Sequence, residues 1–437
     1  MSQAIKEKSF YREAFEAAAR AGEPEWLARA RAAALERFEG LGFPTTREED
    51  WKYTNVAPLA RSEFRPAAGP AGPLDAGEAE RFVYEEARRS RLVFVGGRFR
   101  PELSALDALP GGVVALDLAE AARGGHAGLV REKLEARAQA PAFESLNAAL
   151  TAGGALVLVP DGARVEAPLQ LLFLSAQDGS ASFPRVLVAA GRDSRLDIIE
   201  SYAAAGEVSY LTNAFVEVFV GDGARVTHYK VQDEGERAFH VASTRADVGR
   251  DASYDLTTVT LGARLSRHDI EVRLGREGGE CHVDGLYIVG DGQHADTHSV
   301  IDHLVPRGTS RQNYKGILDG KSRAVFNGRV FVHRDAQQTD AVQSNKNLLL
   351  SGEARVDTKP QLEIFADDVK CAHGATVGQL EEEELFYLLS RGLHPDLARN
   401  LLTYGFAEEI VEKIKFDSIR AQLDGAILNR LRARLEV

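Results

Sequence analysis

Cys371 and His373 have the side-chain types and the spacing that metal chemistry requires. They stand two positions apart, so both side chains lie on one face if this segment is a strand. Thiolate and imidazole are both ligands for iron and zinc. One of each is half of a tetrahedral site at most, so the chain alone cannot close a cluster site around them. From these residues alone, a buried cysteine beside a structural histidine remains the alternative.

A second group of potential ligands lies earlier in the chain. It comprises Cys281, His282, His294, Asp296, His298 and His303. Three members stand at every second position of one run, which would align them on one face of a strand. These three are His294, Asp296 and His298. The pattern fits a metal site, but we favour a polar ladder along one face of a sheet as its explanation.

The sequence shows no arrangement that is typical of an enzyme. Ser344 and Ser351 have no adjacent histidine that could activate them. Residues 316–322 superficially resemble a phosphate-binding loop, but too few residues separate their glycines. A strand-like run at 323–326 follows where such a loop requires a helix. We therefore expect a protein that is neither an ATPase nor another kind of enzyme.

The elements that must position these residues are short apolar runs that end in similar turns. The turns lie at 161–163, 191–194, 221–224, 249–252 and 352–354. The first four begin about 30 residues apart, a period that indicates stacked repeats. Because no helical pattern intervenes, the period predicts a β-solenoid or an antiparallel meander over about 155–375. It leaves the handedness and the number of strands per coil open, and no six-residue period of a hexapeptide-repeat acyltransferase is present.

Helical patterns flank the repeats on both sides. Residues 1 to about 62 are helical with breaks, and a helical pattern resumes at Glu381 and continues to the end. We expect three regions: a helical and mixed region at 1–150, a β-solenoid core at 151–378 and a helical domain at 379–437. The end of a solenoid needs only a helix or two as a cap. The remaining C-terminal length is therefore expected to dock a partner.

Composition restricts the class of protein. The chain has 437 residues, 44% of them hydrophobic and 27% charged, as in ordinary globular proteins. Its net charge of −12 argues against nucleic acid as a partner. The two cysteines exclude a disulfide framework, and no apolar run approaches the roughly 20 residues that span a membrane. The first residues lack the apolar core of a signal peptide. These features predict a cytoplasmic protein that binds neither nucleic acid nor a membrane.

The stretch from Ser310 to Leu389 alternates short β-rich runs with Asn, Gly and Asp corners, and Asp367–Thr376 surrounds the Cys-x-His pair. Together with Arg47–Tyr53 near the N-terminus, this stretch resembles the SufB/SufD family of iron–sulfur cluster assembly proteins, and SufD more than SufB. The short length and the absence of an N-terminal cysteine cluster favour SufD. The resemblance covers most of the chain. It implies a mainly β fold, a right-handed parallel β-helix flanked by helical regions.

The resemblance also implies a function. A SufD-like chain is a non-enzymatic subunit of the SUF scaffold, in complex with SufB and with the ATPase SufC, which would dock on the C-terminal helices. ATP-driven closure of two SufC subunits would move SufD against SufB and open the site where the cluster is built. His373 and Cys371 would face that contact as metal ligands, whereas SufB supplies the essential cysteine. The iron–sulfur cluster would be transient and shared with SufB, so no permanently bound cofactor is expected.

Two questions stay open at this stage. A β-helix enzyme that acts on polysaccharide is the alternative function, and it predicts a secretion signal and clustered Asp carboxylates beside a basic residue on one solenoid face. The signal is missing from the first residues, and the Asp residues mostly lie at turns. The sequence also does not decide whether the isolated chain forms a homodimer or binds iron alone.

Overall fold

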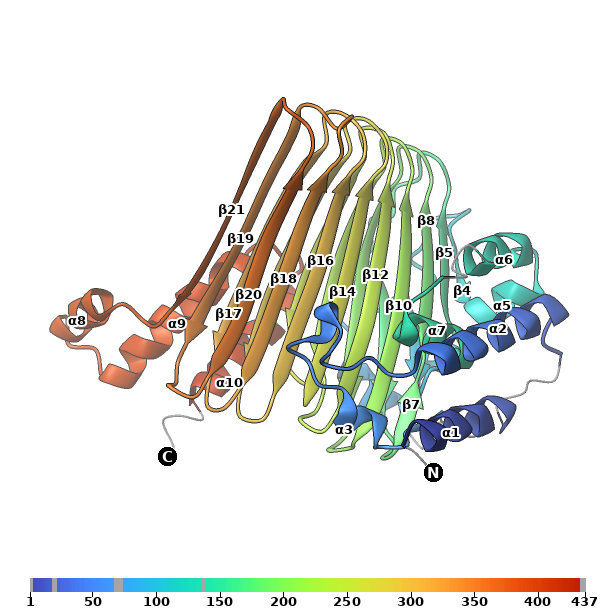
Figure 1. Ribbon diagram of the computed structural model, residues 1–437, viewed down its shortest axis with the longest axis horizontal. Helices are drawn as coiled ribbons and strands as arrows, with labels where there is room; N and C mark the ends of the chain where they lie inside the picture. The colour runs from blue at the N-terminus through green and yellow to red at the C-terminus, as the bar shows by residue number, and fades with distance from the viewer. Residues whose placement is uncertain (1–2, 18–21, 67–73, 136–138, 433–437) are drawn as a thin grey trace.

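The core of the molecule is a flattened β-helix made of two sheets that enclose one interior (Figure 1). The computed structural model describes residues 3–17, 22–66, 74–135 and 139–432. Each coil contributes one long strand to each sheet, and the sheets comprise 11 and 10 strands. The predicted β-solenoid is therefore confirmed, and the antiparallel meander is excluded because successive coils pair in parallel.

We call the two sheets A and B. In spatial order, sheet A comprises β20 (Arg355–Ile364), β18 (Arg323–Val332), β16 (His294–His303), β14 (Leu265–Leu274), β12 (Phe239–Val248), β10 (Tyr210–Val220), β8 (Arg185–Ala190), β5 (Gly154–Val159) and β4 (Val114–Asp117), with β7 (Ser180–Ser182) and β1 (Arg65–Pro66) off this path. Sheet B comprises β21 (Val369–Gly378), β19 (Thr339–Leu349), β17 (Thr309–Leu318), β15 (Glu280–Val289), β13 (Ser253–Thr260), β11 (Arg225–Asp233), β9 (Arg195–Ala204), β6 (Leu169–Ser175), β2 (Arg91–Val95) and β3 (Arg98–Phe99).

Side chains alternate between the interior of the β-helix and its outer faces, as the pleat of a strand requires. Because successive coils pair in register, each inward residue lies over its counterpart in the coil before it. One such column contains Cys281, Ser310, Ala341 and Cys371. The apolar side chains of the interior form one cluster that extends through the stack. No coil can bury its inward side chains alone, so the stacking itself creates the core.

Four of the five turns that the sequence predicted, at 161–163, 191–194, 221–224 and 249–252, stack at the corner where the chain passes from sheet A to sheet B, whereas the turn at 352–354 lies at the opposite corner, between β19 and β20. Gly162, Asp193, Gly223 and Asp251 adopt positive φ in successive coils. The N–H of Gly223 donates to the carbonyl of Arg250 in the next coil at 2.8 Å. A Cβ on Gly223 would meet Oδ1 of Asp193 at 2.2 Å, so this position requires glycine for space as well as for φ. The recurring Gly and Asp thus reflect one left-handed residue at this corner in each of these four coils.

Helices flank the β-helix, and several of them cover the outer face of one of its sheets. They are α1 (Gln3–Ala17), α2 (Glu25–Leu41), α3 (Ala57–Ala60), α4 (Ala76–Glu80), α5 (Leu118–Arg123), α6 (Ala127–Glu135), α7 (Ala142–Leu150), α8 (Glu382–Ser390), α9 (Pro395–Val411) and α10 (Asp417–Arg432), with short 3₁₀ turns at Glu49–Trp51, Glu85–Ala87 and Pro101–Leu103. The helices α2 and α7 pack on sheet A, whereas α9 and α10 pack on sheet B. In the described part of the chain, no helix combines the length and the apolar composition of a membrane span.

The C-terminal helices do not cap the β-helix, so that expectation was wrong. Ile410 of α9 and Leu423 of α10 pack against Tyr229 and Leu286 on the outer face of sheet B. This face is itself apolar and must be covered, which is why the amphipathic helices lie there. The last coil, β20 and β21, stands at the left edge of the β-helix in Figure 1, and no further described strand pairs with it.

Candidate functional site

Cys371 and His373 lie on β21, the last strand of sheet B. They pair in register with Ala341 and Gln343 of β19, which are both buried in the interior. Because in-register neighbours of a parallel sheet point to the same side, Cys371 and His373 also point to the interior side. His373 is nevertheless exposed and Cys371 half-buried, since no described strand continues the sheet beyond β21. The fold thus places the predicted pair on one face at the uncovered end of the core.

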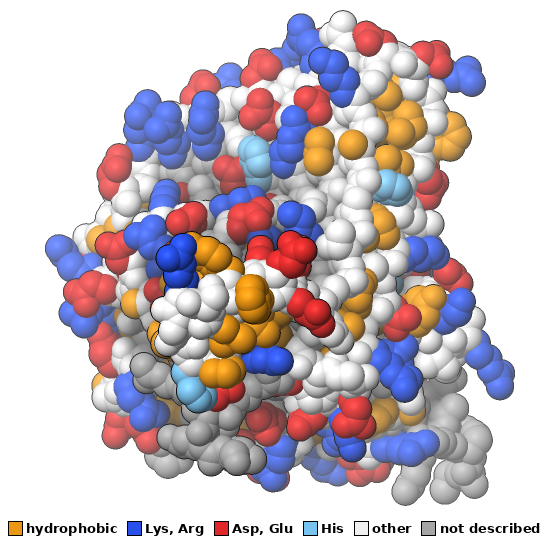
Figure 2. Space-filling view, turned by 90° about the vertical axis from the view of Figure 1, so that its left-hand side faces the viewer, with side chains coloured by type: hydrophobic (Ala, Val, Ile, Leu, Met, Phe, Trp, Pro, Cys, Tyr) orange, Lys and Arg blue, Asp and Glu red, His pale blue; other side chains and the backbone are white. Residues whose placement is uncertain are grey.

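The uncovered end is an apolar surface with two open sheet edges, and we call the surface formed by β20 and β21 the open coil. Its side chains include Ile364 and Val377, of which Val377 is 48% exposed, and Phe365 follows directly after β20 and is exposed as well. Figure 2 views the molecule from this side, and hydrophobic side chains are visible there among charged ones. Long, uncovered edge strands invite pairing with another chain, so proteins ordinarily cover or blunt them. The open coil therefore has the features of a protein contact surface.

The two candidate ligands differ in how readily they could bind a metal. Burial raises the pKa of the Cys371 thiol, and the carboxylate of Asp340 raises it further, although the N–H of Ala341 opposes both. The thiol is therefore protonated at neutral pH and must lose its proton when it binds a metal ion. A neutral imidazole binds iron without that step. His373 is thus the better ligand of the two in the isolated chain.

Cys281 and His282 lie on opposite faces of β15, so they cannot hold the same ion. Cys281 is fully buried, and burial raises the pKa of its thiol. His282 lies with Nδ1 2.7 Å from Oδ1 of Asp255, and this hydrogen bond raises the pKa of the imidazole. His303 points into the interior, where its Nε2 lies 2.9 Å from Oγ of Ser310. Among the described residues, no group of three or more His, Cys, Asp or Glu side chains has the geometry to hold a metal ion.

His294, Asp296 and His298 form a polar ladder on the outer face of β16. Oδ2 of Asp296 accepts hydrogen bonds from Oγ1 of Thr54 at 2.5 Å and from Nη1 of Arg267 at 2.7 Å. Nε2 of His294 lies 2.8 Å from Oγ1 of Thr54, and Nε2 of His298 lies 3.1 Å from Oδ1 of Asp296. These contacts attach the N-terminal segment to sheet A, which supports the polar-ladder interpretation over a metal site.

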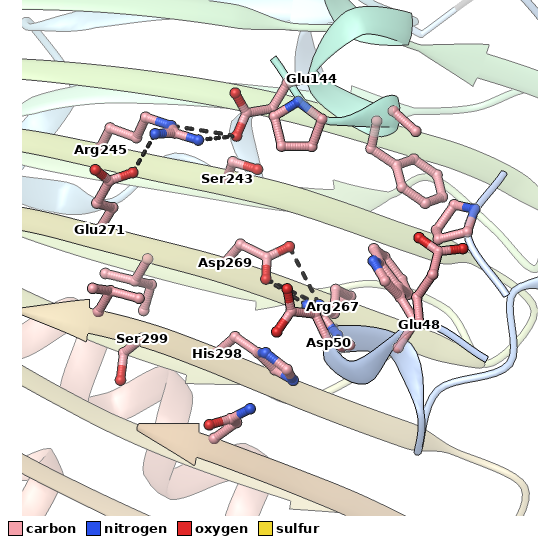
Figure 3. A pocket seen from close by; sticks show the side chains of 18 of the residues that line it. Glu48, Asp50, Glu144, Ser243, Arg245, Arg267, Asp269, Glu271, His298 and Ser299 are labelled. Atoms are coloured by element: carbon pink, nitrogen blue, oxygen red, sulfur yellow. Dashed lines mark hydrogen bonds and ion pairs between the residues drawn. The ribbon is translucent and has the colours of Figure 1, made fainter. Parts of the chain in front are cut away.

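A surface cavity of about 630 Å³ lies beside this ladder, between sheet A and the N-terminal region (Figure 3). On its floor Arg245 binds Glu144 at 2.8 Å and also Glu271, and Arg267 binds Asp269 at 2.7 Å. Clustered carboxylates beside basic residues are what the polysaccharide alternative predicts. However, a glycosidase needs a carboxylic acid that can donate a proton to its substrate, and Glu144, Asp269 and Glu271 are each bound by a guanidinium group. The cavity therefore does not support that alternative.

The interior holds a polar cluster that the sequence analysis missed. Its side chains, none more than 5% exposed, are Glu200, His228, Lys230, Glu234, His240 and His268. Nε2 of His228 lies 2.7 Å from Glu200, and Nδ1 of His240 lies 2.7 Å from Glu234. Burial lowers the pKa of Lys230. The cluster could have been found in the sequence by comparing polar residues that are one coil apart, because Glu200 and Lys230 are register partners on adjacent strands.

A second exposed apolar surface lies on α8 and α9. Phe386 is 72% exposed, and Tyr387, Leu397 and Leu401 are also large exposed hydrophobic residues. No residue of α8 is buried. In Figure 1 this helix projects away from the β-helix. Clustered exposed side chains of this kind mark interaction sites, and we call these four residues the α8–α9 patch.

Comparisons with known proteins agree with this architecture. Residues 173–406 match the model of the SUF system FeS cluster assembly SufBD core domain, and residues 1–171 match that of the SufBD protein N-terminal region. A SufBD family iron–sulfur cluster assembly protein of Synechocystis is 38% identical over 91% of this chain and 89% of that relative. The iron–sulfur cluster assembly protein SufD of Escherichia coli is 31% identical over 91% of both chains, and SufD of Bacillus subtilis is 28% identical over 94% of this chain and 95% of that relative. The chain therefore belongs to the SufBD family of iron–sulfur cluster assembly proteins.

Proposed function

We propose that this chain is a SufD-like subunit of the SUF scaffold, which forms a complex with SufB and the ATPase SufC and helps to assemble the nascent iron–sulfur cluster at its contact with SufB. The chain acts as a scaffold in the cytoplasm and is not an enzyme. The cluster is the cargo of the complex and not a permanent cofactor. The similarity to two proteins named SufD over most of the chain supports the SufD-like role.

The open coil is the observation that carries this proposal. Its inward side chains belong to columns of the core, but no described coil covers them. A partner that continues both sheets would pair the free strand edges and bury these side chains in one step. Cys371 and His373 would then lie inside the contact, where ligands from SufB can complete the coordination that two side chains cannot provide.

The α8–α9 patch is the proposed docking surface for SufC. It lies on helices next to the open coil, because α8 begins four residues after β21 ends. The α9 helix is tied to sheet B through Lys315 of β17, whose Nζ donates to the carbonyl oxygen of Phe406 on α9 at 2.9 Å. A force that SufC applies to these helices would therefore reach the strands beside the open coil. ATP-driven closure of two SufC subunits would in this way move the chain against SufB and open the cluster-building site.

Replacing Val377 by aspartate tests the contact with SufB. Val377 lies on the interior side of β21, in register with the buried Asn347, so the new carboxylate would face the contact unpaired. We expect SufB binding to weaken by about 100-fold or more, as for an uncompensated buried charge. Pull-down of SufB by the tagged chain measures this. Leu41→Asp is the control, because Leu41 is 53% exposed on α2, away from β21 in Figure 1. Normal SufB binding by a folded Val377→Asp chain would place the contact elsewhere.

A further inference from the structure

A ladder of buried side chains leads from the middle of the β-helix to the open coil. Nε2 of Gln343 donates to Oε1 of Gln312 at 2.7 Å, and Nε2 of Gln312 donates to Oγ of Ser299 at 2.8 Å. All three residues are at most 2% exposed. Gln312 and Gln343 are register partners on β17 and β19. Gln343 therefore donates to its register partner in the coil before it, whereas Gln312 donates across the interior to Ser299 of sheet A and uses its carbonyl oxygen to accept from the coil that follows.

Gln343 ends this ladder with an acceptor that is not used. Its Oε1 is buried and has no hydrogen-bond partner among the described residues. The side chain has little freedom to find one by rotation, because it occupies the space above a glycine: a Cβ on Gly328 would meet Nε2 of Gln343 at 2.4 Å. A buried, unpaired carbonyl oxygen costs about 1–3 kcal/mol. A hydrogen-bond donor at the next position of the column would therefore pair with Oε1 of Gln343 and remove this cost.

The next residue of the column is His373. It is the register partner of Gln343 on β21, and its side chain points to the same interior side. An imidazole carries one N–H donor in its neutral form, which is the group that Oε1 of Gln343 lacks. Histidine ligands in metal sites almost always donate their other ring N–H to such an acceptor, which fixes the tautomer and the ring orientation.

We propose that Gln343 is a positioning residue for His373: when the imidazole turns toward the interior, Oε1 of Gln343, which has no partner in the structure, accepts the N–H of one ring nitrogen and holds the other nitrogen, with its lone pair, toward the open coil. This inference rests on the proposed function of His373 as a ligand for the nascent cluster. The hydrogen bonds that join Ser299, Gln312 and Gln343 hold the Gln343 amide in place, so the imidazole of His373 is oriented before SufB binds. Cys371 has no such positioning residue, because its register partner is Ala341, whose side chain cannot form a hydrogen bond.

The tautomer of His373 in the isolated full-length chain tests the hydrogen bond without any metal. In protein labelled with ¹⁵N at histidine, the two ring-nitrogen signals of His373 are identified by their loss in His373→Ala. We expect one neutral tautomer to dominate in the wild type. Gln343→Leu, which keeps the volume but removes the acceptor, should shift the tautomer ratio by roughly 2- to 10-fold, the factor that one net hydrogen bond provides.

Asn345→Leu is the matched control. Asn345 is a buried amide on the same strand and the same side, but its register partner is Ala375. Asn345→Leu removes hydrogen bonds with Tyr314, Asn347 and Thr358, so it should disturb the fold at least as much as Gln343→Leu, yet it should leave the tautomer ratio of His373 unchanged. An equal ratio in the wild type and Gln343→Leu, or an equal shift in Asn345→Leu, would overturn the proposal.

Cluster formation in cells separates this inference from the proposed function. We expect Gln343→Leu to reduce the cluster content of the complex with SufB and SufC by roughly 10-fold, as for other outer-sphere partners of metal ligands, and to have no further effect in a His373→Ala background. If His373→Ala builds clusters normally, the proposed function of His373 fails while the tautomer result stands. If His373→Ala abolishes clusters but Gln343→Leu does not reduce them, Gln343 does not position the ligand.

Discussion

Replacing His373 by alanine should stop most iron–sulfur cluster formation in the cell while the protein stays folded and bound to SufB and SufC. The reason is its position. His373 is exposed at the uncovered end of the core, so the truncation removes little buried contact. However, His373 is one of the two candidate ligands at the open coil, so its removal would take away half of the coordination that this chain offers to the nascent cluster. We expect the cluster content of the complex to fall by roughly 10-fold or more, since even the loss of an outer-sphere partner of a ligand has effects of that size.

Thermal melting, pull-down of SufB and SufC, and iron content, all measured on His373→Ala, decide between the two roles of this residue. A purely structural histidine would cost about 1–3 kcal/mol of stability, and assembly would fail only because the protein does. Cys371→Ser is the companion variant, and we expect a milder effect because the essential thiol is expected on SufB. A stable His373→Ala chain that forms the complex and builds clusters at the normal level would defeat the hypothesis.

The second large effect is expected at the α8–α9 patch. Phe386→Asp combined with Leu401→Asp should weaken SufC binding by roughly 100-fold or more, because two apolar anchors of an interface are lost and two charges are desolvated. Both side chains are exposed, so the fold should not change. Binding of purified SufC to the variant, followed by calorimetry, measures the effect.

Leu428→Asp is the control for this experiment, because Leu428 is an exposed leucine on α10 outside the patch. Deleting residues 380–437 would be a poorer test. The deletion removes Ile410, Ile419 and Leu423, which cover apolar residues of sheet B, and the exposed sheet would be expected to aggregate. SufC binding of normal strength by the double variant would mean that SufC docks elsewhere.

The β-solenoid could be predicted because one local requirement repeats from coil to coil. Successive coils have a residue with positive φ at the same corner, and in the first of them this residue is Gly or Asp, as at Gly162, Asp193 and Gly223. The Cys-x-His spacing likewise predicts that Cys371 and His373 share a face, because strands alternate. Both inferences use patterns that can be read along the sequence, a repeated turn and a two-residue spacing, and the structure agrees with both.

Features that depend on register between coils could not be predicted in the same way. The sequence shows Gln312, Gln343 and His373 about one coil apart, but only the observed pairing shows that they form one column on the interior side. The position of α9 and α10 depends on which outer face of the β-helix is apolar, and this becomes visible only when the strands of sheets A and B are assigned. Without that assignment, the C-terminal helices are expected at the end of the solenoid, where the structure leaves the open coil.

The claim that SufB meets this chain at the open coil is tested most directly by crosslinking within the assembled complex. A photo-crosslinking amino acid is placed at position 377 of the tagged chain, and at position 41 for comparison, and the complex is purified from the native host together with SufB and SufC. The account predicts that position 377 crosslinks to SufB and that position 41 does not. A complex that contains SufB but crosslinks to it only from position 41 would contradict the account.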